Sequence, residues 1–334
     1  MLQTAFWGSL LERLGQGTPL YLVAERQGQR VGQLLLIQGP LVRHGGGGLR
    51  GAMARVAGLA GFGRLEYAEG PVLLDPVREA QVMRAFLGWI ADFARRHRIL
   101  VVRGADAVAR PPADPAGWRQ AFEDFGYAPS PWGTYLVDLS PEEDAIWQAV
   151  DHAVRKGVKK AVREGLAVRR IADPAEYRRA FLCPYLAWKG ETDTLAEVGR
   201  KAGIVWTHPA HDDHYRYFVA TDAAGETLGV LGMYLNAGIA TEITSGIAPA
   251  AFERKLPVQD LLHWEMFRDA RQAGCTVFDL AGVSPAPATP KEENIRRFKK
   301  KWGGRYVEYG RHEWRHRLLV LAARWLPGLA GPAP

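Results

Sequence analysis

Cysteine is scarce in this sequence of 334 residues, which contains only Cys183 and Cys275. The two lie far apart and among apolar residues, so neither belongs to the closely spaced pairs that bind zinc or build a disulfide framework. Isolated thiols of this kind are typical of a reducing compartment. We therefore expect a cytoplasmic protein without a zinc knuckle.

Long apolar runs are also missing. No stretch of about 18 or more apolar residues occurs, so no segment is expected to span a bilayer. The first fifteen residues lack the basic start and apolar run of a signal peptide. Hydrophobic residues nevertheless make up 47% of the chain and tryptophan occurs 11 times, which is enough to build packed cores.

The surplus of positive charge is small. Lys and Arg number 43 against 36 Asp and Glu, which gives a net charge of +7. This balance does not indicate a dedicated nucleic-acid-binding protein. It suits an anionic substrate that bears phosphate, or a transient contact with tRNA.

Familiar catalytic patterns are absent as well. No serine or cysteine stands in a pattern with histidine and an acid, so an activated protein nucleophile is not indicated. His208, His211 and His214 suggest a metal site at first sight. Their spacing of three does not match a helix-borne zinc-ligand pair, and no partner carboxylate is indicated, so we expect no metal.

What the sequence does contain is a repeated order of elements. Residues 19–39 and 217–235 each predict a hairpin that begins near a Tyr-x-Val-Ala sequence. Each hairpin is followed by a predicted strand, a long helix, a strand, a second helix and a strand. The strand and long helix fall at 65–74 and 77–98 in the first copy, and at 240–247 and 258–273 in the second. Such duplication predicts an α/β (α+β) protein of two related units, each a mixed twisted sheet flanked by helices.

The second copy ends in a basic cluster beside a glycine turn, residues 298–304 with the sequence Phe-Lys-Lys-Lys-Trp-Gly-Gly. We expect a short helix at 294–299, the turn at Gly303 and Gly304, and a closing strand at 305–309. A cation at such a helix end can stabilise an anionic or developing oxyanion group. Basic residues in a last helical turn also form ordinary solvated faces, so both interpretations stay open.

A second basic segment lies between the two copies. Residues 147–164 predict a helix on which Lys156, Lys160 and Arg163 share one face, so they could meet a phosphate or a tRNA backbone together. A solvated face is again the alternative. Two further helices are expected at 174–189 and 195–202.

The order of several motifs resembles the FemABX family, whose members aminoacylate cell-wall precursors. The motifs are Leu-Leu-His-Trp at 261–264, Asp-x-x-Gly at 279–282, Phe-Lys at 298–299, the glycine turn at 303–304, and the basic helix that leads through Ala-x-x-x-Gly at 161–165 into a strand. The resemblance implies two tandem GNAT-like acyltransferase domains, at 1–139 and 140–310. The segment 171–213 leaves no room for the coiled-coil arm of FemA and FemB members, so the chain looks more like FemX.

The resemblance also implies catalytic residues. Lys299 would lie near the donor and the reacting centre, with Phe298 packed beneath it. Asp106 would lie near the acceptor amine, although the Arg-x-Asp-Pro of the family is Arg-Gly-Ala-Asp at 103–106 here. Residues expected to bind substrate are Trp7, Arg103, Arg155, Lys156, Lys159, Lys160, Arg163, Arg216 and Lys300.

The function implied by the resemblance is transfer of an amino acid from aminoacyl-tRNA to an amine of a UDP- or lipid-linked peptidoglycan precursor. Aminoacyl-tRNA would be the donor substrate, and no cofactor would be needed. No lysine accompanies Trp7, and the strand at 241–244 is not aromatic-rich as in the family, so a different acceptor remains open. We expect a monomer.

The tail at 311–325 alternates Arg with Trp and Leu and predicts a basic amphipathic helix. Such a helix either packs on its own domain, here the first one with the helix extending over 311–334, or makes peripheral contact with the inner surface of an anionic membrane.

Two alternative functions stay open. An acetyl-CoA enzyme would be expected to show Arg/Gln-x-x-Gly-x-Gly/Ala before its central helix, where backbone amides cradle the pyrophosphate. Neither residues 246–258 nor residues 70–75 contain it, so dependence on CoA is disfavoured. The alternatives are a GNAT-fold N-acyltransferase with another donor or acceptor, and a non-catalytic module that binds tRNA or a membrane.

Overall fold

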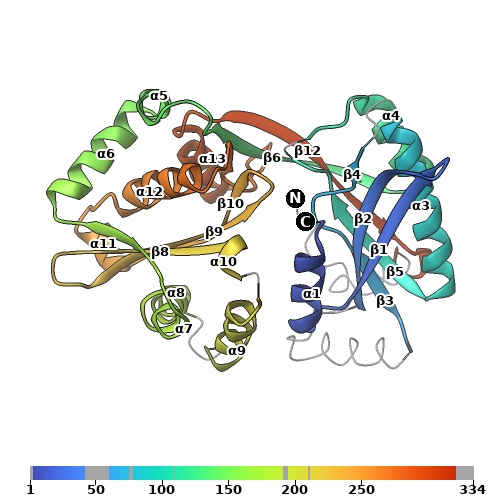
Figure 1. Ribbon diagram of the computed structural model, residues 1–334, viewed down its shortest axis with the longest axis horizontal. Coiled ribbons are helices and arrows are strands. Elements are labelled where there is room, and N and C mark those ends of the chain that lie inside the picture. Colours follow the sequence, from blue (N-terminus) through green and yellow to red (C-terminus); the bar gives the residue numbers. More distant parts are fainter. Residues whose placement is uncertain are drawn as a thin grey trace. The chain divides into compact units, whose positions relative to one another are not determined.

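The computed structural model describes residues 3–41, 60–74, 78–108, 110–190, 195–209 and 211–320. The chain divides into two compact units (Figure 1). Unit 1 consists of residues 1–132 and 308–334, and unit 2 of residues 133–307.

Unit 1 contains a mixed sheet. The strands are β1 (Thr18–Arg26), β2 (Gln29–Pro40), β3 (Gly63–Glu66), β4 (Val72–Leu73), β5 (Ile99–Ala105) and part of β12 (Arg305–Arg315). Neighbours β1–β2, β2–β3 and β5–β12 are antiparallel, whereas β3 and β5 are parallel. Strand β4 pairs with β2. A parallel pair needs a crossover connection, and a helix supplies it.

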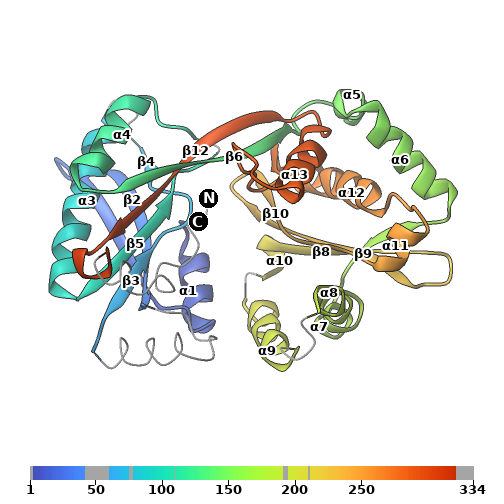
Figure 2. The same ribbon diagram turned by 180° about the vertical axis from the view of Figure 1, so that it is seen from behind.

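That crossover helix is α3 (Glu79–Arg96), which lies on one face of the sheet together with α4 (Pro115–Asp124). Helix α1 (Ala5–Arg13) lies on the other face (Figures 1 and 2). Apolar residues of α3 recur at helical spacing and form the core of the unit. Met83, Phe86, Leu87 and Ile90 are all buried there.

In unit 2 the strands pair in the order β6–β11–β10–β9–β8–β7. The strands are β6 (Ala128–Asp138), β7 (Ala167–Arg170), β8 (Tyr215–Thr221), β9 (Thr227–Asn236), β10 (Ile239–Ile247) and β11 (Val277–Asp279). Only β10 and β11 pair in parallel among these described neighbours. Their crossover helix is α12 (Val258–Gln272), which buries Leu262, Met266 and Phe267.

Helices cover both faces of this sheet. On one side lie α5 (Glu143–Ala149), α6 (His152–Arg163), α12 and α13 (Pro290–Lys300), and on the other α7 (Pro174–Glu176), the π-helical turn η1 (Tyr177–Leu182), α8 (Cys183–Lys189) and α9 (Leu195–Trp206) (Figure 1). Helices α10 (His211–His214) and α11 (Pro249–Glu253) are short. Within the described residues, no helix is long and apolar enough to cross a membrane.

The predicted repeat is confirmed: each copy runs through a hairpin, a strand, a helix, a strand, a helix and a strand. The last strand of each copy, however, divides between the two units. Residues 133–138 of β6 belong to unit 2, where β6 pairs with β11. Residues 308–315 of β12 belong to unit 1, where β12 pairs with β5.

Three predicted elements were wrong in extent. The helix expected at 147–164 is broken into α5 and α6, because Asp151 caps a new helix by accepting a hydrogen bond from the Ala153 amide at 2.7 Å. The strand expected at 65–74 is interrupted between Glu66 and Val72. A helix was expected from Arg311, but β12 continues to Arg315 because it pairs with β5, and residues 321–334 lie outside the described part.

Candidate active site in unit 2

Lys299 lies in the last turn of α13, and its side chain is only 9% exposed. The sequence fixes the start of this helix through Pro290 and a capping box, in which Thr289 and Glu292 each bond to the backbone of the other. From that start, helical periodicity turns Lys299 inward and leaves Lys300 exposed. Burial therefore distinguishes two lysines that are adjacent in the sequence.

The turn after β11 receives the Lys299 amine. Its Nζ donates hydrogen bonds to the carbonyl oxygens of Ala281 at 3.1 Å and of Gly282 at 3.2 Å. The Asp279 carboxylate shapes the turn by accepting from the Ala281 amide at 2.9 Å and from the Thr134 hydroxyl at 2.5 Å. Ala281 has a φ of +62°, a left-handed conformation. The Asp-x-x-Gly motif thus aims two carbonyls at the amine.

Burial dominates the electrostatics around this amine. It lowers the pKa of Lys299, and the negative charges of Glu242 and Asp279 only partly oppose this. Burial likewise raises the pKa of Asp279, although its hydrogen bonds with Thr134 and Ala281 and the charge of Lys299 favour the ionised form. Lys299 therefore sits in an environment that makes its positive charge costly.

Two further polar residues, which the sequence did not single out, belong to this cluster. Glu242 on β10 has a side chain only 11% exposed, and its Oε2 lies 3.2 Å from Nε2 of His263, which is fully buried on α12. Burial would raise the pKa of Glu242, but the charge and hydrogen bond of His263 and the charge of Lys299 outweigh it and lower that pKa. The sequence signals that could have identified these two residues were a charged residue within a predicted strand, for Glu242, and a histidine on the buried face of a predicted helix, for His263.

Aromatic rings enclose the cluster. Phe298 is partly buried and meets the His263 ring edge to face, with ring centres 5.1 Å apart. Trp302 is fully buried and stacks on His263, with ring centres 5.2 Å apart. Phe298 thus lies within the packing around Lys299, on the same turn of α13.

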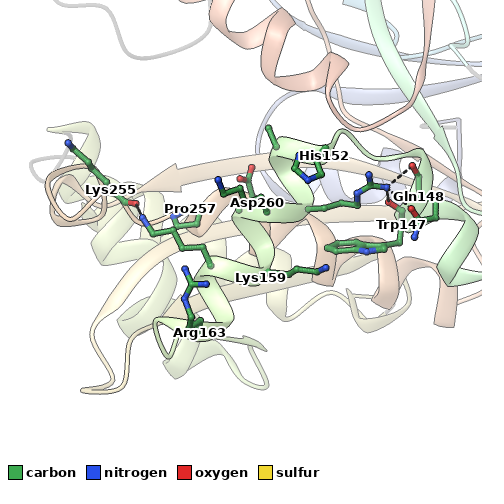
Figure 3. Close-up of a pocket in the computed structure, with 13 residues that line it drawn as sticks. Trp147, Gln148, His152, Lys159, Arg163, Lys255, Pro257 and Asp260 are labelled. Atoms are coloured by element: carbon green, nitrogen blue, oxygen red, sulfur yellow. Dashed lines mark hydrogen bonds between the residues drawn. The ribbon is translucent and has the colours of Figure 1, made fainter.

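A basic groove of about 690 Å³ opens on α6 and the start of α12 (Figure 3). Trp147 and Gln148 lie at one end and Lys255 at the other. The groove is lined by five of the predicted substrate-binding residues, which are Arg155, Lys156, Lys159, Lys160 and Arg163. The prediction that Lys156, Lys160 and Arg163 share one face of a helix is confirmed.

The basic side chains of this groove differ in how firmly they are held. Arg155 donates to the backbone and side chain of Gln148, at 2.9 and 2.8 Å, and Lys160 donates to the Lys255 carbonyl at 2.9 Å. Lys156, Lys159 and Arg163 are exposed, and no acceptor in the described part of the chain binds them. These three cations are therefore available to an anionic ligand.

One acidic residue, Asp260, lies among these cations. Burial raises its pKa to about 6, against the opposing charges of Lys301 and His263. Helix α6 approaches Asp260 closely at Gly157, where an added Cβ would lie 2.1 Å from the Asp260 carboxylate. Glycine at this position is what allows α6 and α12 to pack together beneath the groove.

The other predicted site residues make contacts of their own. Arg103 pairs with Glu313, its cross-strand neighbour on β12, and Arg216 pairs with Asp269. Trp7 is half-buried on α1, and Lys300 is exposed. The structure thus gathers the α6 residues in one groove and packs Lys299 with Phe298, whereas Arg103 and Arg216 are engaged in ion pairs.

Asp106, in unit 1, is buried at 6% exposure and accepts three hydrogen bonds. The donors are the Trp118 indole at 2.8 Å, the Gly310 amide at 2.9 Å and Nε2 of His312 at 2.8 Å. The residue thereby ties β12 to the segment that follows β5 and to α4. These contacts favour a structural role, and a role near the acceptor amine stays a prediction.

Within the described residues, no group of three or more His, Cys, Asp or Glu is arranged to hold a metal ion. His211 stacks on Trp206 at 4.2 Å, and Nδ1 of His214 lies 2.8 Å from the Leu235 carbonyl. Both histidines thus contribute to packing around β8 and β9. Cys183 and Cys275 are free thiols.

Comparison with known proteins agrees with this fold. Residues 148–300 match the acetyltransferase (GNAT) domain family. Among solved structures, FemX is similar with a TM-score of 0.72 and 12% identity over 98% of this chain and 94% of that chain. L-PGS from Bacillus licheniformis has a TM-score of 0.56 and 14% identity, over 98% and 93% of the two chains.

A tandem GNAT protein from the clavulanic acid biosynthesis pathway is similar with a TM-score of 0.54 and 14% identity, over 92% of this chain and 87% of that chain. No curated protein matches the sequence. At these identities the matches establish the fold, which is that of tandem GNAT-like acyltransferases. The FemX-like fold predicted from the sequence motifs is confirmed.

Proposed function

We propose that this protein is an aminoacyltransferase that moves an amino acid from aminoacyl-tRNA to an amine of a peptidoglycan precursor, as in interpeptide bridge formation. The fold supports a transferase of acyl or aminoacyl groups. The observation that carries the finer proposal is the buried amine of Lys299 at the turn after β11.

An ammonium group has three N–H donors, and those of Lys299 have two acceptors in the described residues, the Ala281 and Gly282 carbonyls. No carboxylate of the described chain lies within ion-pair distance of this amine. The third donor can therefore turn to a substrate oxygen. In a site of low polarity, such a preorganised donor strongly stabilises a developing oxyanion.

The proposed reaction begins from an ester that is already activated. The acceptor amine attacks the ester carbonyl of aminoacyl-tRNA, so a C–N bond forms and negative charge develops on the carbonyl oxygen. The C–O bond to the ribose then breaks, the amine loses one proton, and the ribose oxygen gains one. Lys299 would donate its hydrogen bond to the carbonyl oxygen, while both substrates are held in contact.

The basic groove would hold the phosphates of a substrate. Helix α6 carries three exposed positive charges, those of Lys156, Lys159 and Arg163. Their ammonium and guanidinium groups suit phosphate oxygens. We assign the groove to the backbone of the tRNA. Release of counterions on binding would make the affinity fall as the salt concentration rises.

The segment before α12 favours aminoacyl-tRNA over acetyl-CoA as the donor substrate. The connection from β10 to α12 is the short helix α11 and a turn at Lys255, and Pro257 precedes the first residue of α12. Proline has no amide hydrogen, so the connection lacks one of the backbone donors that cradle a pyrophosphate.

The two proposed substrates, aminoacyl-tRNA and the precursor, would place the protein in the cytoplasm. If the precursor is lipid-linked, the protein would act near the inner membrane surface.

A mass measurement tests the proposal. Purified protein is mixed with a set of charged tRNAs and a UDP-linked or lipid-linked muropeptide precursor. The expected product is the precursor plus one amino acid residue. An acetylated product with acetyl-CoA would favour a GNAT-type acyl-CoA enzyme instead, and tRNA binding without any product would favour a non-catalytic module.

A further inference from the structure

The basic groove contains an aromatic side chain that the reaction above does not use. Trp147 of α5 lines the groove beside the cations of α6 (Figure 3). Its indole is partly exposed and packs on the buried Trp264 of α12, with ring centres 4.6 Å apart and planes tilted by 58°. The contact with Trp264 holds the indole in place while part of it borders the groove. A flat ring that enters the groove can therefore stack on it.

Arg155 is held at the same end of the groove. Its Nη1 donates to the Gln148 carbonyl at 2.9 Å, to Oε1 of Gln148 at 2.8 Å and to the Trp147 carbonyl at 3.4 Å. A guanidinium group has five N–H donors, and Nη1 supplies only two of them. The donors on Nε and Nη2 have no acceptor in the part of the chain that the structure describes. This pair of nitrogens is a fork that suits two oxygens of one phosphate.

We propose that Trp147 and Arg155 form a subsite for one unpaired nucleotide, whose base stacks on the indole and whose phosphate binds the guanidinium. The subsite takes its nucleotide from the single-stranded 3′ end of tRNA. This assignment to tRNA rests on the proposed function, whereas the stacking of a base on Trp147 follows from the groove itself.

The ring favours a single strand over a duplex. Bases inside a duplex stack on their neighbours, so a protein ring can stack only on a base that is free of them. The amino acid of aminoacyl-tRNA is attached to such an unpaired end. Residues 156–163 extend over about 10 Å of α6 at 1.5 Å per residue, so Lys156, Lys159 and Arg163 can meet further phosphates of the same strand.

Coenzyme A shares part of this chemistry, because it also carries a base and phosphates. The line of cations along α6 suits the repeated phosphates of a strand better than a single nucleotide. Binding of coenzyme A is therefore an outcome that the experiment must distinguish from binding of RNA.

The test measures binding of a labelled four-nucleotide RNA that ends in CCA to the full-length protein by fluorescence anisotropy. The comparison strand is abasic and has the same length and charge. The wild-type protein should bind the normal strand about 5- to 100-fold more tightly than the abasic one. This ratio should fall to near one in Trp147→Leu and stay close to the wild-type value in Trp147→Phe, which keeps a ring.

Trp188→Leu is the matched control. Trp188 is also partly exposed, but it lies on α8, on the other side of the sheet, so its replacement should leave the ratio unchanged. An equal ratio in the wild type and in Trp147→Leu, or equal binding of both strands by the wild type, would overturn the subsite.

Arg155→Gln tests the phosphate contact separately. It should weaken both strands alike and lower the slope of log affinity against log salt by about 0.7, the value for one contact with a single strand. An unchanged slope would contradict the part assigned to Arg155.

A spectroscopic reading covers the case in which Trp147→Leu does not fold. The protein is labelled with 5-fluorotryptophan, and the Trp147 signal is identified by its loss in Trp147→Phe. The normal strand should shift this ¹⁹F signal and the abasic strand should not. No shift, or the same shift with both strands, would refute stacking on Trp147.

Binding needs neither a charged amino acid nor a precursor, so the two proposals fail separately. Base-dependent binding without any transfer would refute the proposed function and keep the subsite. Transfer by a protein whose RNA binding does not depend on Trp147 would keep the function and refute the subsite. Tighter Trp147-dependent binding of coenzyme A than of the RNA strand would overturn the assignment to tRNA.

Discussion

At the scale of single residues, a change of one position along α13 separates a solvated lysine from a buried one. Lys299 is 9% exposed and bonded to two carbonyls, whereas Lys300 is exposed. A buried ammonium that lacks a close carboxylate gains from any negative charge that forms beside it. This difference makes Lys299 the lysine whose replacement we expect to affect the reacting centre directly.

Lys299→Met should lower the rate of aminoacyl transfer about 100- to 1,000-fold, because one oxyanion donor is worth about 2.7–4 kcal/mol of barrier. The measurement is kcat/KM with charged tRNA and precursor. Lys291→Met, which removes an exposed lysine at the start of the same helix, is the matched control and should retain nearly full activity. Near-normal turnover of Lys299→Met would contradict the assignment.

Asp106→Asn separates a structural role from a catalytic one. Three N–H groups donate to this carboxylate, and an amide nitrogen in place of one oxygen would face a donor. We expect a loss of about 1–3 kcal/mol in the free energy of unfolding, measured with urea. Unchanged stability together with lost transfer would point instead to a role at the acceptor amine.

At the scale of elements, the break between α5 and α6 gives the basic groove its shape. Asp151 starts a new helix, and Gly157 lets this helix approach α12, so that the cations of α6 line one hollow with Lys255. Without the helix start at Asp151 and the close packing at Gly157, the same basic residues would lie on an ordinary solvated helix face.

Replacing Lys156, Lys159 and Arg163 together by Gln should weaken tRNA binding and reduce its salt dependence. Each lost phosphate contact lowers the slope of log affinity against log salt by about 0.7–0.9. Filter binding over a series of salt concentrations measures this slope. The control replaces three exposed arginines of unit 1, Arg95, Arg96 and Arg98, and an equal change in both triple variants would contradict a specific groove.

The glycine turn after α13 allows a test of local strain. Gly303 has a φ of +74°, and an added Cβ would lie 2.5 Å from the Ala149 carbonyl oxygen. Gly303→Ala should therefore destabilise the protein by more than the approximately 1–2 kcal/mol of a left-handed alanine. Gly225→Ala is the matched control, since its φ is +83° but nothing lies within 4 Å. Equal losses in denaturant midpoints would rule out the contact with Ala149.

At the scale of the whole molecule, the chain order and the structural units do not coincide. Unit 1 receives its last strand from residues 308–315, after the chain has completed unit 2. This strand also carries His312, which binds Asp106 and stacks on Phe122 at 3.5 Å. The stability of unit 1 therefore depends on the far end of the sequence.

Truncation after Val307 should weaken unit 1 and spare unit 2. The cut removes the β12 residues that pair with β5 and leaves Asp106 buried without two of its donors. Hydrogen exchange should show lost protection in β5 and α4 and retained protection in β8 to β10. Full protection of β5 in the truncated protein would contradict this dependence.

The sequence by itself determined the local elements and their order. Hydrophobic periodicity, the proline and glycine positions and the repeated hairpin act over a few residues, so they gave the order of the elements, although not the extent of every one. They predicted α12, α13 and the shared face of Lys156, Lys160 and Arg163, and the motif order predicted the FemX-like fold.

Only the tertiary structure decided which groups surround Lys299 and which strands complete each unit. Lys299 on α13 meets the carbonyls of Ala281 and Gly282, and Glu242 on β10 meets His263 on α12, so these contacts depend on how separate elements pack. The pairing of β12 with β5 joins residues about two hundred positions apart. Such contacts arise from long-range burial and strand pairing, which leave no periodic signal in the local sequence.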